Sequence, residues 1–503
     1  MTTTADNPSS STRAQRVLVM ATVIMASSMY VTDLVVIGMA LPHMQGTFSA
    51  TPVQISWVAT GFVLGSTVMI VSIGWISARV GVRRMFMICI VTFMVLALLA
   101  ANARSLEEEV VLRLLMGMAG APVQSLAQVI LLNTYPRAQS GQALALWGSG
   151  VMIAPICALP IGGVVIDVFG WPGVFYMYLP TGALALVGAF FFVPKAQAEE
   201  RRPLDWFGLA TLILAFAWLQ YALSRGARED WFESTSILIA VLVAVVSAYL
   251  FVVHSLTTKN PLLPAEMFRN RNFAFSALGG FVFGASATPL TLLLALMLQN
   301  QLNYPVELIG LVLVPRVIGI LISQYAVAFL IVRVDPRHLM AGGAITCSAA
   351  TWIMSGWSLD VSPWQVAWTV LMHGLGDGFI WMALNPLAFS TVASRHRAQA
   401  VPFYYLSVNV GFSLGVASIM TYWAHSSQAN HGLLAEFITP FNELIRGDRL
   451  PSDLAAAAAM AGEISRQSAM IAYNNCFVVI TIGILFVVPI AYVIRNPGWR
   501  PTS

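Results

Sequence analysis

The chain has few charged residues and almost no lysine. Of its 503 residues, 10% are charged and 58% are hydrophobic, and the mean hydropathy is +0.77, whereas about a quarter of the residues of a soluble domain are charged. The only two lysines, Lys195 and Lys259, stand outside any GxxxxGK[ST] sequence, so the phosphate-binding loop of ATP-driven proteins is absent. We therefore predict a multi-pass membrane protein that binds no nucleic acid and is not powered by ATP.

Cysteine is also scarce. The four cysteines lie in separate apolar segments and none forms a CxxC pair, which argues against a disulfide framework and against a metal site. We expect them to pack as small hydrophobic side chains. They are Cys89, Cys157, Cys347 and Cys476.

Apolar runs of about 18 or more residues, each long enough to cross a bilayer, recur along the chain. Residues 1–15 and 498–503 lie outside these runs, and we expect cytoplasmic tails there, the first of them disordered. The runs predict about fourteen helices, at 17–41, 53–76, 85–101, 109–133, 142–166, 173–193, 207–224, 234–255, 273–298, 307–332, 338–356, 363–389, 400–424 and 471–494.

Basic residues concentrate in alternate loops between these helices. This asymmetry predicts that both termini are cytoplasmic and that the chain spans a cell inner (plasma) membrane many times. The loops assigned to the cytoplasm contain Arg79, Arg83 and Arg84; Arg137; Lys195, Arg201 and Arg202; Lys259, Arg269 and Arg271; Arg333 and Arg337; and Arg395 and Arg397.

Two charged loops that contain proline divide the helices into six, two and six. The loop PKAQAEERRPLDW follows the sixth predicted helix, and TTKNPLLPAEMFRNRN precedes the ninth. We predict an all-α membrane protein with six-helix bundles at 16–194 and 272–497 and an inserted pair at 195–271, an arrangement similar to the parallel halves of major facilitator transporters. The longest loop, 425–470, should contain a short extracytoplasmic helix that serves as a cap, a docking surface or a solvated spacer.

The first predicted helix contains a single carboxylate, Asp33. An acid at a helix centre costs about 2.5 to 3.5 kcal/mol on insertion scales, so it should face protein or a water-filled cavity. Arg113 in the fourth helix is its expected partner, because an acid near an arginine can be balanced to gain and lose a proton. A structural ion pair, or a carboxylate hydrated near the membrane surface, is the alternative.

A second set of charged residues falls in the later helices. Arg316 and Asp377 are the intramembrane charges there, and His373 shares a helix face with Asp377 because four residues separate them. This spacing favours a proton relay. It would also suit two metal ligands, but the sequence offers no third, so we expect no metal.

Two further segments contain residues that favour bends and close packing. WGSGVMIAPICALPIGG has two prolines and several glycines, which suit a bent helix on which two bundles rock. GWISARVGVRR joins the second and third predicted helices, where Gly81 permits a sharp turn and arginines lie beside the anionic leaflet.

Together these segments resemble the fourteen-helix drug:proton antiporters of the major facilitator superfamily, the EmrB/QacA type. The resemblance extends from about residue 16 to 497. In order, the similar segments are TDLVVIGMALP, GWISARVGVRR, RLLMGMAGAPVQSLAQ, APICALPIGG, VPRVIGI and VRVDPR.

The resemblance implies a proton-coupled exporter that works by alternating access, with Asp33 as the first-helix acid and Arg113 as the fourth-helix arginine. It also implies a latch in the inter-helix loop and an antiporter motif in the fifth helix. The residues of these two motifs are Gly74, Arg79, Gly81, Arg83, Arg84, Pro155, Pro160, Gly162 and Gly163. Because Ala78 replaces the acid usual in the loop motif, we expect no carboxylate latch there; Asp377 matches no acid of the family.

The wall of a substrate cavity should mix aromatic and apolar residues with few hydrogen-bonding groups. The alternative for each candidate is a hydrogen bond between helices or an anchor at the membrane surface. The candidates are Gln124, Gln128, Trp381, Asn385, Tyr404 and Asn409.

We therefore predict a multidrug or small-molecule efflux transporter that lies in the lipid bilayer, uses a proton gradient, has no cofactor and exports an amphipathic substrate. Some relatives work with a periplasmic adaptor protein and an outer-membrane channel, and the sequence leaves open whether this chain has such partners or acts alone. A facilitator or importer of a nutrient or lipid is the first alternative. A membrane-embedded acyl or prenyl transferase is a remote one, since it needs a catalytic constellation beyond His373 and Asp377.

Overall fold

The computed structural model describes most of the chain, and every regular element within the described residues is a helix. Part of the expected N-terminal tail is helical, because α1 begins at Arg13, whereas 1–12 and 498–503 lie outside the described residues. The described residues are 13–50, 52–194, 205–226, 229, 231–258, 261, 267, 269–331, 333–392, 397–437 and 454–495.

Seven helices make up the first bundle. Helix α4 begins where the Ser105 side chain accepts a hydrogen bond from the Glu108 amide (3.2 Å), with glutamates in its first turn that suit the positive end of a helix. Gly81, at φ +93°, makes the turn between α2 and α3 that a side chain would disfavour. The helices are α1 (Arg13–Thr47), α2 (Pro52–Val80), α3 (Val82–Ala100), α4 (Leu106–Thr134), α5 (Arg137–Phe169), α6 (Gly173–Tyr176) and α7 (Tyr178–Phe192).

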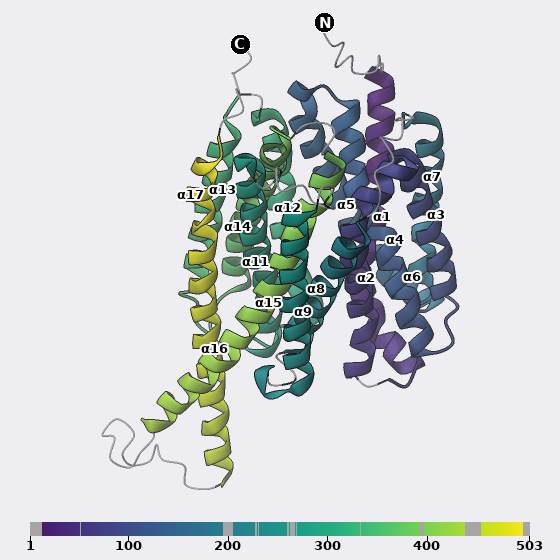
Figure 1. Ribbon diagram of the computed structural model, residues 1–503. Coiled ribbons are helices and arrows are strands. Elements are labelled where there is room, and N and C mark those ends of the chain that lie inside the picture. The colour runs from purple at the N-terminus through teal and green to yellow at the C-terminus, as the bar shows by residue number, and fades with distance from the viewer. Residues whose placement is uncertain are drawn as a thin grey trace, which may run out of the picture.

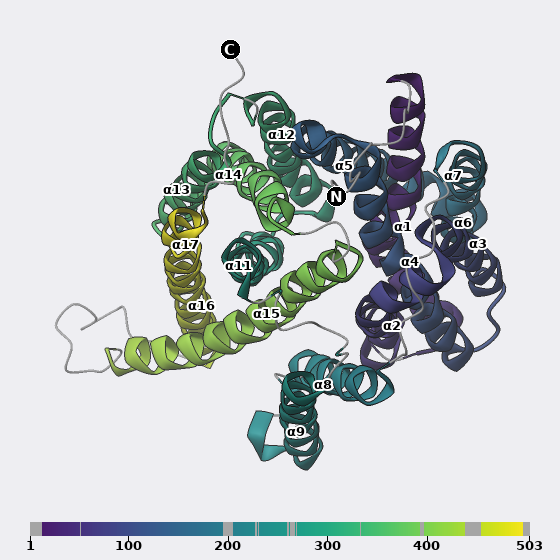
Figure 2. The ribbon, with the colours of Figure 1, turned by 45° about the horizontal axis from the view of Figure 1, so that its top comes forward.

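The inserted pair and the second bundle follow. Helices α8 and α9 stand outside both bundles, beside α2 and α15 (Figure 2). The elements are α8 (Trp206–Arg225), η2 (Trp231–Glu233), α9 (Thr235–Thr257), α11 (Arg271–Asn300), α12 (Val306–Leu330), α13 (Pro336–Met354), α14 (Pro363–Phe389), α15 (Arg397–Glu436), α16 (Leu454–Leu485) and α17 (Val487–Val493).

The expected extracytoplasmic loop differs from the prediction. Helix α15 continues to Glu436, and the alanine-rich segment expected as a separate short helix is instead the start of α16, which runs unbroken to Leu485. Both helices protrude beyond the bundles on the face opposite the one where α1 begins and α17 ends (Figure 1). Alanine has the highest helix propensity, so this stretch extends the neighbouring span more readily than it stops.

Every predicted span falls on a helix, and in the part of the chain that the structure describes fewer than fourteen of these helices have both the length and the apolar composition of a span. Among the described residues ten helices are long and apolar enough to cross a bilayer, and α2 is an eleventh if its two parts, which meet at 57°, form one span. The three other predicted spans fall on α5, α13 and α14, of 33, 19 and 27 residues. The prediction of a helical membrane protein with two bundles and an inserted pair is confirmed.

The two bundles repeat one packing scheme. In each of them the second helix crosses the fourth at a glycine: Gly117 of α4 lies against the Phe62 carbonyl of α2, and Gly374 of α14 lies against the Arg316 carbonyl of α12. A Cβ atom at either glycine would lie 2.0 Å from that carbonyl oxygen. Only glycine permits this approach, and in the second bundle it brings Arg316 of α12 close to Asp377 of α14.

The bundles meet near the face where α1 begins. Gln128 of α4 donates hydrogen bonds to Asn385 of α14 (3.3 Å) and to the Tyr405 hydroxyl of α15 (2.5 Å), and Gly148 of α5 lies against Met382 of α14. Successive spans alternate in direction, so these residues all lie toward the same face. The structure is therefore closed between the bundles on the side of the termini.

Candidate functional site

The first predicted ion pair is present. The Arg113 guanidinium lies 2.6 Å from Asp33 Oδ1, joining α4 to α1, and both side chains are at most 1% exposed. Arg113 also lies over the ring of Phe62, 4.4 Å from its centroid. An ion pair taken this far from water loses the hydration of both ions, so its stability depends on keeping the partners together.

One half of the Asp33 carboxylate is unsatisfied. Its Oδ2 atom is buried and has no hydrogen-bond partner among the described residues. The Tyr178 hydroxyl interacts electrostatically with Asp33 but lies outside hydrogen-bond geometry. A buried oxygen without a donor is costly, and a proton bound there would remove that cost.

A third charged residue, Glu109, belongs to this site and was not predicted. Its side chain is fully buried one turn before Arg113 on α4, and neither carboxylate oxygen has a hydrogen-bond partner among the described residues. In the sequence Glu109 is the first residue of the predicted span 109–133 and directly follows Glu107 and Glu108. It was therefore interpreted as part of a charged turn at the surface. The spacing of four residues from Arg113 was the available signal, because such residues share a face.

The second predicted ion pair joins α12 to α14. Arg316 lies 2.7 Å from Asp377 Oδ2, with the side chains 12% and 6% exposed. The same guanidinium donates to the Thr291 hydroxyl and to the Ala287 carbonyl (3.3 Å) of α11. Three helices of the second bundle are therefore tied together at one arginine.

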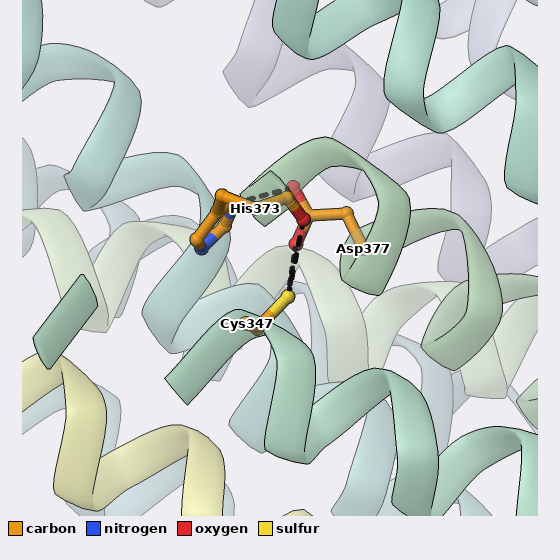
Figure 3. Close-up of side chains that lie close together, drawn as sticks. All are labelled: Cys347, His373 and Asp377. Atoms are coloured by element: carbon orange, nitrogen blue, oxygen red, sulfur yellow. Dashed lines mark hydrogen bonds and ion pairs between the residues drawn. The ribbon is translucent and has the colours of Figure 1, made fainter. Parts of the chain in front are cut away.

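Two more groups lie at Asp377, as Figure 3 shows. His373 Nδ1 is 3.2 Å from Asp377 Oδ2, and Cys347 Sγ of α13 lies 3.2 Å from the His373 carbonyl and 3.6 Å from Asp377 Oδ1. Asp377 therefore has a neighbour at each oxygen, although neither ring nitrogen of His373 makes a hydrogen bond among the described residues and a thiol is a weak donor. Cys347 packs in the hydrophobic core, as expected of a small apolar side chain, and its thiol also faces this cluster.

The Cys347 thiol also completes a possible set of metal ligands. One donor atom each from Cys347, His373 and Asp377 lie within 4.8 Å of one another, so the expectation that no third ligand exists is wrong. Arg316, however, is bound to the same Oδ2 atom that faces His373. A cation there would have to displace a buried guanidinium, and the donor set fits a charge cluster better than a metal centre.

The predicted cavity residues lie around the seam between the bundles. Gln128 and Asn385 hydrogen-bond across it, Tyr404 is fully buried, and Trp381 is half-buried and stacks on Phe283, 5.5 Å between ring centroids. Gln124 is half-buried and its amide oxygen has no partner among the described residues. The structure therefore places Gln128 and Asn385 at the seam. It packs Trp381 and Tyr404 beside Tyr405, which also bonds across the seam. The role of all these residues in binding stays a prediction.

The predicted motif residues occupy two places. The segment expected as a loop is almost entirely helical, because Gly74 and Arg79 lie in α2, Arg83 and Arg84 lie in α3, and only Gly81 stands between the two helices. Arg79 lies over the Trp75 ring (5.5 Å), and Arg83 donates a hydrogen bond to the Phe190 carbonyl of α7. Gly74 is buried and Arg84 is exposed.

The fifth-helix motif lies against α1. Pro155 is buried within α5 and Pro160 also lies in this helix. A Cβ atom at Gly162 would lie 2.9 Å from Val36 of α1, and one at Gly163 would lie 3.6 Å from Met39. These glycines therefore keep α5 close to the helix that carries Asp33.

An apolar groove of about 580 Å³ lies between the inserted pair and the second bundle. Its lining comes from α8, α9 and Phe403 of α15, and is almost entirely apolar. Phe216 and Leu219 also line a small space of about 10 Å³ beside Thr67, Gln220 and Asn409. Phe216 and Phe403 also pack against the buried cluster of Ile70, Ala121 and Leu406 at the seam, so these two aromatic side chains lie between the groove and the seam.

Two helical bundles with repeated packing, a closed seam and buried charges define a membrane transporter. The family model described as "Major Facilitator Superfamily" matches residues 18–416, and the chain belongs to that superfamily. Its members are transporters, so the alternative of a transferase is excluded.

Known relatives are similar in sequence to this chain over nearly its whole length. The chain is 28% identical over 484 residues to the multidrug export protein EmrB of Escherichia coli strain K12, covering 92% of each chain. It is 27% identical over 486 residues to the fatty acid resistance protein FarB of Neisseria gonorrhoeae, covering 94% of this chain and 95% of that one. The predicted resemblance to EmrB-type multidrug efflux proteins is confirmed.

Solved structures share the fold. The proton:xylose symporter XylE aligns with a TM-score of 0.61 at 10% identity, covering 95% of this chain and 96% of that one. The human organic anion transporter MFSD10 aligns with a TM-score of 0.58 at 12% identity, covering 94% of this chain and all of the other. At these identities the likeness concerns the fold alone.

Proposed function

We propose that this protein is a proton-coupled efflux antiporter that exports amphipathic small molecules by alternating access. The observation that carries the proposal is the buried Asp33–Arg113 pair, in which one carboxylate oxygen has no partner among the described residues. A carboxylate that is held by one arginine and is otherwise unsatisfied can exchange a proton when its surroundings change. The energy source is then the proton gradient, and no cofactor is required.

The proposed cycle depends on protonation of Asp33. In this proposal both termini lie on the cytoplasmic side of an inner (plasma) membrane, so the closed seam at Gln128 and Asn385 is the cytoplasmic gate. A proton from the opposite side binds Asp33, which weakens its attraction to Arg113 and releases the substrate outward. Opening of the gate then exposes Asp33 to the cytoplasm, where it loses the proton and a new substrate binds.

The predicted cavity residues fit this cycle as groups that change partners. When the cytoplasmic gate opens, Gln128, Asn385 and Tyr405 must separate, and their amide and hydroxyl groups then face the space between the bundles. Trp381, Tyr404, Gln124 and Asn409 flank the same seam. We assign these groups to substrate binding in the inward-open state.

The second charge cluster has a different role in this proposal. Asp377 is approached at both oxygens by Arg316, His373 and Cys347, so little is gained by protonating it. We assign it as a fixed ion pair that holds the second bundle together. The predicted relay through His373 remains the alternative, and the thermal stability of Asp377→Asn separates the two.

The apolar groove favours a substrate that reaches the protein from within the bilayer. The names of relatives include multidrug export and fatty acid resistance, which fits molecules that partition into lipid. We assign the groove to the apolar chain of such a substrate. Phe216 and Phe403 line the groove and also pack against the seam, which supports this occupant because a chain in the groove would lie beside the seam.

Ala248→Trp tests the groove, because it places an indole inside the groove lining. We expect proton-driven transport of dodecyltrimethylammonium to fall severalfold while transport of the smaller cation ethidium changes little. Val246→Trp on the same helix is the matched control, since Val246 is 46% exposed and does not line the groove. Equal transport by the two variants would exclude the groove as an entry route.

A partner on the extracytoplasmic side is also proposed. The ends of α15 and α16 protrude beyond the bundles there (Figure 1), and they offer a helical surface to a periplasmic adaptor protein that would connect to an outer-membrane channel. In the alternative, the protein acts alone and this surface is solvated.

The experiment that tests the proposed function uses purified protein in vesicles. We expect an imposed pH gradient to drive accumulation of ethidium, and addition of ethidium to collapse the gradient, as reported by a pH-sensitive dye. A protonophore should abolish the accumulation. Ethidium movement that is unaffected by the pH gradient would instead support the facilitator alternative.

A further inference from the structure

The buried Glu109 is the strongest feature that the proposed cycle does not yet use. Within the described residues, Asp33 and Glu109 are the two fully buried carboxylates near Arg113. Glu109 interacts electrostatically with Arg113, Asp33 and Glu108. Two carboxylates therefore share one buried guanidinium.

Charge balance decides the state of Glu109. If both acids were ionised beside one arginine, the site would hold a net negative charge away from water, which is strongly unfavourable. Asp33 is the acid in contact with Arg113, at 2.6 Å, whereas both oxygens of Glu109 lack hydrogen-bond partners among the described residues. Glu109 is therefore the acid that holds a proton in this conformation.

The position of Glu109 along α4 indicates the face from which the proton reaches the site. Glu109 is four residues after Ser105, which caps the start of α4, and this end lies on the face away from the termini. Arg113 and Asp33 lie one turn deeper. A proton that enters from that face reaches Glu109 before it reaches Asp33.

We propose that Glu109 is a second proton-binding carboxylate and the alternate partner of Arg113, an inference that rests on the proposed proton-coupled function. In the step it performs, the Glu109 carboxylic acid gives its proton to the Asp33 carboxylate. The Arg113 guanidinium then moves from Asp33 to the newly ionised Glu109, so that the charge of the site is unchanged. A glutamate four residues before an arginine is well placed on a helix for such a pair.

The groups that face the exchange come from three helices. They are Asp33 and Tyr30 of α1, Arg113 and Glu108 of α4, and Tyr178 of α7. Arg113 is the only cation among them, so whichever acid is ionised is the one that the guanidinium binds.

The test compares Glu109→Gln with Glu107→Gln, an exposed acid in the same turn. In vesicles with an imposed pH gradient, we expect Glu109→Gln to reduce proton-coupled ethidium transport on the order of tenfold, since it removes a positioned proton donor. Glu107→Gln should transport as the wild type does. If the two variants transport equally while the wild type is driven by the gradient, the inference is wrong and the proposed function stands; if the wild type is not driven, the proposed function itself fails.

A stability measurement tests the inference without transport. In Asp33→Asn, Glu109 can ionise and pair with Arg113, so the thermal unfolding midpoint in detergent should fall only slightly. In the double variant Asp33→Asn/Glu109→Gln no carboxylate remains for the buried guanidinium, and the midpoint should fall by clearly more than the sum of the single changes. If the midpoint of the double variant falls by no more than the sum of the two single changes, Glu109 is not the alternate partner.

Discussion

Asp33→Asn is expected to abolish proton-driven transport. The amide keeps the size of the side chain and can still accept a hydrogen bond from Arg113, but it neither binds nor releases a proton. We expect ethidium accumulation under an imposed pH gradient to fall to the level of vesicles without protein. The measurement is the initial rate of accumulation, normalised to the amount of correctly inserted protein.

Asp33→Glu is the matched control, since it retains the titrating group and adds one methylene. We expect it to keep measurable coupling at a reduced rate, because the 2.6 Å contact with Arg113 must readjust. Transport by Asp33→Asn at a rate near that of Asp33→Glu would contradict the assignment of Asp33 as the coupling acid.

Asp377→Asn is expected to have the largest effect on stability. Removing one partner of a buried ion pair costs about 3–5 kcal/mol, because the other charge is left uncompensated. Here Arg316 would retain neutral acceptors only, namely the Thr291 hydroxyl, the Ala287 carbonyl and the amide oxygen of the substituted side chain, and would have no counter-ion. The measurement is thermal unfolding in detergent.

Two further variants show whether a loss of stability in Asp377→Asn comes from the buried charge that is left without a partner. The double variant Arg316→Met/Asp377→Leu removes both charges and should recover most of the lost stability. Glu463→Gln removes a partner of the largely exposed pair with Arg466 and should change little. If Asp377→Asn is as stable as the wild type yet loses coupling, Asp377 belongs to the relay and is not a fixed pair.

We therefore propose that the two ion pairs differ in function because their surroundings differ. Asp377 Oδ2 accepts from Arg316 of α12, and Asp377 Oδ1 lies 3.6 Å from the Cys347 thiol of α13, which favours a permanent charge. Asp33 has one unsatisfied oxygen and Glu109 has two, which favours proton exchange. The first bundle is accordingly assigned to coupling and the second to structure.

The helices and the Asp33–Arg113 pair could be predicted from the sequence because the bilayer makes both obligatory. A span must be apolar and about twenty residues long, and a charge within it needs a partner. The alanine-rich start of α16 could not be assigned in this way, since alanine fits both a separate helix and a continued one.

Contacts between helices were harder to predict. The role of Cys347 depends on how closely α13 approaches α14 at Gly376, where a Cβ atom would lie 2.5 Å from Cys347 Sγ. The spacing of residues in the sequence does not indicate how closely these two helices approach. Glu109 was missed for a related reason: two exposed glutamates precede it, and only the packing of α4 shows that it is buried.

The most direct test of the account is the release of protons when substrate binds. Purified protein in detergent and weak buffer is mixed with ethidium, and the pH change is recorded. We expect the wild type to release protons on binding and Asp33→Asn to bind ethidium without releasing them. Equal release by the two proteins would mean that another group carries the coupled proton, and the central claim would be wrong.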